Sequence, residues 1–299
     1  MFEVLAFIFN CGNVVARYGI LITWALMESA SSQFSPGLLQ NKSYWGDGKS
    51  EVDLYGAEFM RDGQRYPCDL TMIFTPKFVD PLSFADSSME TGAVPAIDMH
   101  EFATMPRGLT AEQRSIRALW RMDFMSLAHI SCAGADGLGQ VVRSIDELRD
   151  KDKPVWRYRS DTYRERVNLQ ELDIAKGLPV SYDELPLRIR TIDFSKQNGV
   201  FEVQLLPSLL ATQEKLGDFS PAKISWKAGE RTIDIDVQHG GGKDHFVLDA
   251  NFPFLLREWN AADGSRFKMK NSLKVAYRNY MKPGDRERAL KDPMLRHPD

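Results

Sequence analysis

Residues 51–75 read EVDLYGAEFMRDGQRYPCDLTMIFT, and this stretch contains the pattern that indicates the fold. Two runs of alternating apolar and polar residues, 51–61 and 64–75, flank the pair Asp62-Gly63. Because both residues of this pair tolerate positive φ, it predicts a tight β-hairpin between the two runs. In the second run the even positions Tyr66, Cys68, Leu70, Met72 and Phe74 fall on one face. Pro67 places the strand near an edge or at its start.

The same alternation returns further along the chain. Residues 116–133 are interpreted as one long strand with one face in the core and one partly in water. A turn at 134–137 leads into a strand at 139–145, and the charged stretch 146–154 is interpreted as a solvated loop. Residues 155–163 alternate again and predict a further strand.

The carboxyl-terminal third contains several alternating runs between residues 222 and 277, separated by glycine-containing turns. Helical signals are few. Ser181 and Glu184 form a capping-box pattern that predicts one or two helical turns ended by Pro186, and 285–291 predicts a short terminal helix. We therefore expect a mainly β protein, a large antiparallel meander forming a curved sheet or half-open barrel with few short helices.

Composition limits the class of protein. The chain has 299 residues, 43% hydrophobic and 26% charged, which is typical of a folded chain and excludes a disordered one. The net charge of −3 provides no strong field to attract nucleic acid. Three cysteines are too few for a disulfide scaffold. In an oxidising compartment Cys68 and Cys132 could pair, and the alternative is that both stay as inert core thiols.

The amino terminus contains the chain's long apolar stretch, residues 1–27, interrupted by Arg17. After Arg17 come about ten apolar residues and the small, polar run 29–32, a pattern typical of an export signal. A short membrane anchor and a buried helix are the alternatives, although the uninterrupted apolar length falls short of the ~20 residues that span a bilayer. We therefore divide the chain into an amino-terminal segment, 1–32, and a single β-rich domain, 33–299.

Catalytic patterns are weak. His239 and His245 flank a glycine turn and could hold a metal ion with Asp236 or Asp244, whereas the simpler interpretation is two exposed loop histidines. No nucleophile elbow occurs, and the glycines at 240–242 lack the rest of a phosphate-binding loop. We predict no catalytic residue, no metal site and no cofactor.

A curved antiparallel sheet with many large apolar side chains can present a concave apolar face, which is able to hold a lipid-like ligand. The predicted lining of that face is aromatic. Its candidate ligand-binding residues are Trp120, Phe124, Trp156, Trp226 and Phe246.

Five stretches together resemble a known family. They are YWGDGKSEVDLY at 44–55, MIFTPKF at 72–78, LPSLL at 206–210, FLLREW at 254–259 with Asp263-Gly264 after it, and YMKPGD at 280–285. As a set they resemble an uncharacterised family of exported bacterial proteins that often carries the label "septum formation inhibitor", over residues 40 to 286. The resemblance implies an export signal, and it supplies no activity and no functional residue. The nucleotide pyrophosphatase suggested by that label would need an α/β chain, which this sequence does not indicate.

These observations lead to one functional expectation and its rivals. We expect an exported, non-enzymatic protein of the periplasm or cell envelope that binds an apolar, lipid-like ligand or an envelope protein, binds no nucleic acid and meets the membrane only through residues 1–32. The rivals are a metal-dependent hydrolase using the loop histidines and a purely structural domain. Finding whether the sheet encloses an apolar cavity would separate them.

Overall fold

The computed structural model describes residues 33–88, 92–123, 125–136, 139–150, 153–162, 167–172, 177–210 and 216–297. The expected export segment and Phe124 therefore lie outside the described residues. No helix in the described ranges is long and apolar enough to cross a membrane.

The described strands all belong to one sheet. It has fifteen strands in the order β8-β7-β6-β5-β4-β3-β2-β1-β15-β14-β13-β12-β11-β10-β9, and its two end strands do not pair, so the sheet is curled but not closed. Neighbouring strands are antiparallel except β9 and β10, which are parallel. The predicted mainly β class, an antiparallel meander with few short helices, is confirmed.

The strands are β1 Ser50–Arg61, β2 Gln64–Val79, β3 Val94–Arg107, β4 Thr110–Arg121, β5 Ser126–Asp136, β6 Gly139–Asp150, β7 Lys153–Thr162, β8 Asn168–Leu172, β9 Pro179–Ser181, β10 Asn198–Leu206, β11 Ser220–Ala228, β12 Thr232–His239, β13 Gly242–Asp249, β14 Leu256–Asn260 and β15 Arg266–Val275. The helical elements are α2 Lys42–Trp45, η2 Tyr182–Glu184, α3 Leu185–Arg188, η3 Ile189–Thr191, η4 Tyr277–Asn279, α4 Asp285–Lys291 and η5 Pro293–Leu295.

The hairpin predicted from residues 51–75 is present as β1 and β2. Arg61 pairs with Gln64 across a turn in which Asp62 has φ 50° and Gly63 has φ 74°. Leu70, Met72 and Phe74 share one buried face of β2, as the alternation predicted. The predicted terminal helix is also present, as α4.

Two strand predictions were wrong. Residues 116–133 form not one strand but the hairpin β4–β5: β4 ends at Arg121, β5 starts at Ser126, and Met125 between them has φ 49° without being a glycine. The charged stretch 146–154 is not a loop, because β6 runs to Asp150 and β7 starts at Lys153. In both places the sequence between the two strands contains no glycine that would have indicated a turn.

The predicted short helix near Ser181 is longer than expected. The Glu184 carboxylate accepts a hydrogen bond from the Ser181 N–H at 2.8 Å, as expected for the capping pattern. Pro186 does not end the helix, because it lies in the first turn, where its missing N–H has no partner to lose. The helical path continues through Thr191, and we call residues 182–191 the central segment.

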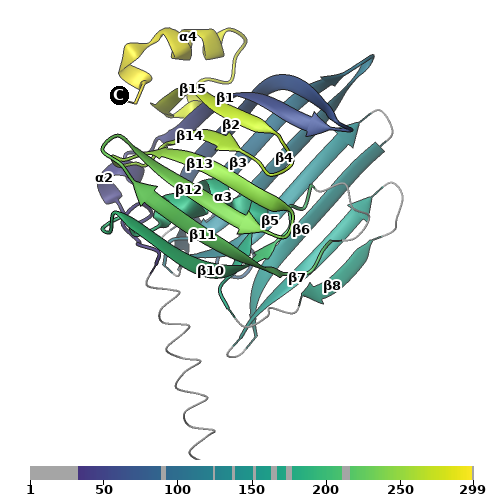
Figure 1. Cartoon of the computed structure of the whole chain (residues 1–299). Helices are drawn as coiled ribbons and strands as arrows, with labels where there is room; N and C mark the ends of the chain where they lie inside the picture. Colours follow the sequence, from purple (N-terminus) through teal and green to yellow (C-terminus); the bar gives the residue numbers. More distant parts are fainter. Residues whose placement is uncertain are drawn as a thin grey trace, which may run out of the picture.

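The central segment lies between two layers of the curled sheet, with β3–β7 behind it and β10–β13 in front (Figure 1). It brings its apolar residues Leu185, Leu187 and Ile189 into the core, where each is fully buried. We call the sheet face that packs toward this segment the inner face, and the opposite one the outer face. The short C-terminal elements, which include α4, lie beside β1 and β15 and pack on the outer face of β15 (Figure 1).

Candidate functional site

The aromatic residues predicted to line a ligand site lie on the inner face of the sheet. Trp120, Trp156, Trp226 and Phe246 are each at most 4% exposed, so they fill the core. The Trp120 indole N–H donates to Glu184 at 2.6 Å. These four side chains line neither of the two grooves described below. Their ligand-binding role stays a prediction, as does that of Phe124, which lies outside the described residues.

The two loop histidines lie on opposite faces of the β12–β13 hairpin. His239 Nε2 is 2.6 Å from Asp244 Oδ2 at the inner face, and its Nδ1 accepts a hydrogen bond from the Gly241 N–H. His245 faces outward and contacts Asp236, with Nδ1 to Oδ1 at 2.9 Å. The two rings therefore do not form the shared metal site that the hydrolase interpretation required. Within the described ranges, no group of three or more His, Cys, Asp and Glu side chains is arranged to hold a metal ion.

An apolar groove lies on the outer face, where one row of side chains in the middle of the sheet is apolar. This outer groove has a volume of about 740 Å³, within the ~300–1,000 Å³ typical of small-molecule sites. Four neighbouring strands supply its floor, because β15, β1, β2 and β3 lie side by side. The apolar floor residues are Val52 and Leu54 of β1, Ile73 of β2, Phe102 of β3, and Leu273 and Val275 of β15.

The carboxyl-terminal elements form one wall of the outer groove. Ala289 of α4 is buried against Leu273 and Val275, and Tyr277 and Tyr280 pack beside them. Two backbone contacts attach the end of this wall to β15: Leu273 bridges to Arg296, and the His297 N–H donates to the Ser272 carbonyl at 3.1 Å. The wall is therefore part of the fold, and it turns an open sheet face into a groove.

The polar rim of the outer groove is a network of basic and acidic side chains. Asp98 accepts from Lys77 at 2.6 Å and from Nε and Nη2 of Arg117, each at 2.9 Å. Lys77 also donates to Asp86 at 2.8 Å, and this hydrogen bond holds the pKa of Asp86 below its ordinary value. The hydrogen bonds to Asp98 raise the pKa of Arg117. Both carboxylates are thus paired with Lys77 or Arg117.

His100 lies between this rim and the apolar floor. Its ring centroid is 5.8 Å from that of Phe102. Burial lowers the pKa of His100. The negative charge of Asp98 opposes this shift, and the positive charge of Arg117 adds to it. We therefore treat His100 as neutral, and it adds a polar but uncharged contact to the groove.

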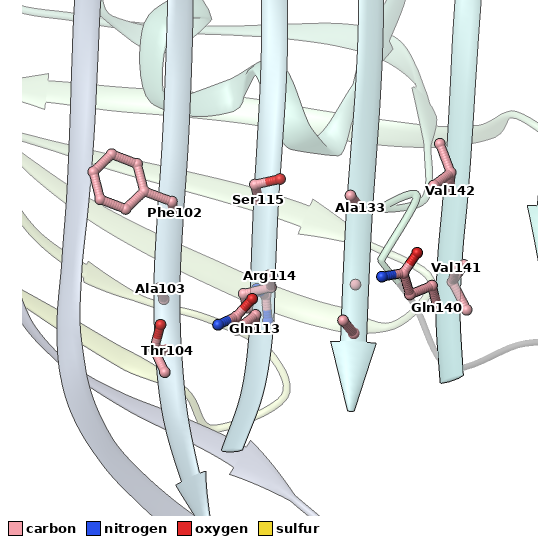
Figure 2. A pocket seen from close by; sticks show the side chains of 12 residues that line it. Phe102, Ala103, Thr104, Gln113, Arg114, Ser115, Ala133, Gln140, Val141 and Val142 are labelled. Atoms are coloured by element: carbon pink, nitrogen blue, oxygen red, sulfur yellow. The ribbon is translucent and has the colours of Figure 1, made fainter. Parts of the chain in front are cut away.

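A second, shallower groove adjoins the first on the same outer face. Figure 2 shows the side chains around it on β3, β4, β5 and β6. Its volume is about 450 Å³. Small residues, Ser115 and Ala133, lie in register between Phe102 and Val142, whose side chains are 41% and 47% exposed. Phe102 lines both grooves, so the two together form a continuous surface across seven strands, from β15 to β6.

Reasoning from the sequence missed the outer groove because it assigned the apolar face of each strand to the core. A signal was present: Val52, Leu54 and Ile73 occupy the positions of β1 and β2 that alternate with the buried residues, and all three are apolar. The hairpin thus carries apolar side chains on its outer face as well as the buried Tyr55, Leu70, Met72 and Phe74 on its inner face. Such a pattern indicates a strand covered on both sides or a strand that faces a ligand.

Comparison with known proteins gives a distant likeness of fold. No family model matches the chain, and no curated protein matches it. One similar solved structure is the crystal structure of a beta-barrel-like protein of the domain of unknown function DUF1849 from Brucella abortus. It is 7% identical, with a TM-score of 0.44, and the match covers 76% of this chain and 98% of that one. The likeness carries no functional residue to this chain.

Proposed function

We propose that the protein is a non-catalytic binding protein of the bacterial cell envelope that holds a lipid-like ligand in the outer groove. One observation carries this proposal. A groove of about 740 Å³ lies on the outer face of the sheet, with an apolar floor that the C-terminal elements cover along one side. A sheet face that meets only water normally carries polar side chains.

The energetics favour an apolar ligand. Each Å² of apolar surface that a ligand removes from water contributes about 25 cal/mol. Leu273 and Val275 are already buried beneath the C-terminal wall, whereas Phe102 is 41% exposed and Met281 is 72% exposed. A hydrocarbon chain lying along Ile73 and Phe102 would cover these surfaces. Because the floor is formed by paired strands, the site is held in shape before the ligand arrives, which lowers the entropic cost of binding.

Placement in the envelope has separate support. The apolar segment after Arg17, followed by the small residues at 29–32, is typical of an export signal. The resemblance of residues 40–286 to an exported bacterial family points the same way. Intact-mass analysis of the protein from its native host tests it, with a mature amino terminus near residues 28–33 expected and a full-length cytoplasmic product contradicting it.

Binding is tested with purified protein in two ways. Organic extraction followed by mass spectrometry should reveal a co-purifying lipid, and a fluorescent fatty-acid probe should bind at micromolar concentration. Ile73→Asn, on the groove floor, should weaken probe binding about tenfold, because one buried aliphatic side chain is worth ~1.5–3 kcal/mol.

The matched control is Val200→Asn. Val200 also lies on a strand, β10, is 54% exposed, and lines neither groove. This variant should bind the probe like the unaltered protein. Absence of both co-purified lipid and probe binding, or equal weakening by the two substitutions, would contradict the proposal.

A further inference from the structure

The outer groove is basic although the chain as a whole is acidic. Four basic side chains line the groove, those of Lys77, Arg117, Arg278 and Arg286. Two acidic ones, Asp86 and Asp98, oppose them, so with His100 neutral the lining has a formal charge of +2. The full chain has a net charge of −3. The excess positive charge is therefore concentrated beside the apolar floor.

Three of these four basic side chains already form ion pairs with acidic residues. Lys77 and Arg117 share Asp98, and Lys77 also takes Asp86. Arg286 pairs with Asp69 at 3.1 Å, outside the groove. Arg278 forms no ion pair or hydrogen bond through its side chain with any residue in the described ranges, and the Asp86 carboxylate senses its charge only at longer range.

Arg278 is also placed where a charged head would emerge from the groove. It lies in η4, Tyr277–Asn279, next to Tyr277 and close in sequence to Tyr280 and Met281, which line the apolar wall. A hydrocarbon chain on the floor would thus end beside an exposed guanidinium. Arginine presents a planar fork of donors that fits the paired oxygens of a carboxylate or phosphate, and such charge-assisted bonds are about twice as strong as neutral ones.

We infer that the ligand of the outer groove is a long-chain amphiphile with an anionic oxygen head, and that Arg278 binds that head while the chain lies on the apolar floor. This inference depends on the proposed function and narrows its ligand class. Lys77 and Arg117 add positive charge to the same neighbourhood, since the charges of Lys77, Arg117 and Arg278 all act on Asp86. The Arg278 guanidinium supplies the direct contact.

Isothermal titration calorimetry with three probes of equal chain tests the inference: oleate, 1-oleoyl lysophosphatidic acid and the neutral monoolein, each below its critical micelle concentration. The two anionic probes should bind about tenfold more tightly than monoolein. Arg278→Gln should remove that advantage and leave monoolein binding unchanged. Whichever anionic probe loses more affinity identifies the head, carboxylate or phosphate.

Arg266→Gln is the matched control, because Arg266 is an exposed arginine on β15 that does not line the groove. It should leave all three affinities unchanged. Equal binding of the anionic and neutral probes would overturn the inference and leave the proposed function standing. Equal losses in the Arg278→Gln and Arg266→Gln variants would also overturn it. Failure of all three probes to bind would contradict the proposed function itself.

Discussion

The side chains of Glu51 and Arg190 form an ion pair in which neither residue is exposed to solvent. Arg190 donates through Nη1 to Oε1 at 2.6 Å and through Nη2 to Oε2 at 2.9 Å, and Nη2 also donates to the Pro253 carbonyl at 3.0 Å. The Tyr44 hydroxyl donates to the same carboxylate. The pair joins β1 to the end of the central segment, so it connects the strand that supplies the groove floor to the interior of the sheet.

Loss of one partner of this pair should destabilise the protein strongly. Burial alone would raise the pKa of Glu51, but the charge and hydrogen bonds of Arg190 outweigh it and hold the pKa below its ordinary value. Arg190→Met would leave that carboxylate buried and unpaired, at a cost of about 3–5 kcal/mol in the free energy of unfolding. Urea denaturation at pH 7 measures it. Glu51→Gln combined with Arg190→Met should cost less than Arg190→Met alone, and a larger cost would contradict this account.

A second buried carboxylate, that of Glu101, should make the stability of the protein fall as pH rises. Burial raises the pKa of Glu101 to about 7, with Arg114 opposing and Asp183 reinforcing the shift. Because the folded-state pKa lies above the unfolded-state value near 4.5, the folded state holds the proton more tightly, and stability falls as pH rises from about 4.5 through 7. At 1.36 kcal/mol per pKa unit, the free energy of unfolding should have fallen by about 3 kcal/mol once the pH is above 7.

Glu101→Gln tests this, because glutamine does not titrate. Urea denaturation of both proteins at pH 5 and pH 8 should show that the variant is relatively more stable at pH 8. A difference between the two proteins that stays constant with pH would show that Glu101 does not titrate in this range.

Gly199 should resist replacement because a tryptophan occupies the space of its missing side chain. Gly199 of β10 pairs with Trp226 of β11, and a Cβ placed on Gly199 would lie 1.9 Å from the indole ring. Gly199→Ala would push Trp226 out of its packed position, and we expect a loss of about 1–3 kcal/mol. Gly240→Ala is the control, because no atom lies within 4 Å of the corresponding Cβ position. Thermal unfolding should separate the two, and equal stabilities would refute the contact.

Cys68 and Cys132 should be found as thiols in the folded protein. Both are free cysteines. Burial raises the pKa of Cys132 to about 12 and that of Cys68 to about 11, so neither forms much of the reactive thiolate at pH 8. Iodoacetamide labelling with peptide mapping should modify Cys132 only after urea unfolding. A peptide containing a Cys68–Cys132 disulfide would contradict this and favour the pairing considered from the sequence.

Several parts of the fold followed from the sequence alone, because they depend on local chemistry. Asp62-Gly63 determines the β1–β2 turn, since both residues adopt positive φ there. The alternation of Leu70, Met72 and Phe74 determines which side of β2 is buried. The Ser181–Glu184 capping contact marks the start of the central segment. Each of these requires only residues within a few positions of one another.

Other features required the tertiary structure. Alternation shows that a strand has two faces but not what lies against either of them, so it could not show that Trp120, Trp156, Trp226 and Phe246 are buried in the core. No glycine lies between β4 and β5 in the sequence, and only the structure shows that Met125 adopts positive φ there. The outer groove exists because β1 pairs with β15, bringing Val52 beside Leu273 across more than two hundred residues of chain, and because α4 packs against that pair. No local pattern encodes such a pairing, since the free energy that selects it comes from contacts between residues far apart in the chain, in the core on the inner face and beneath α4 on the outer face.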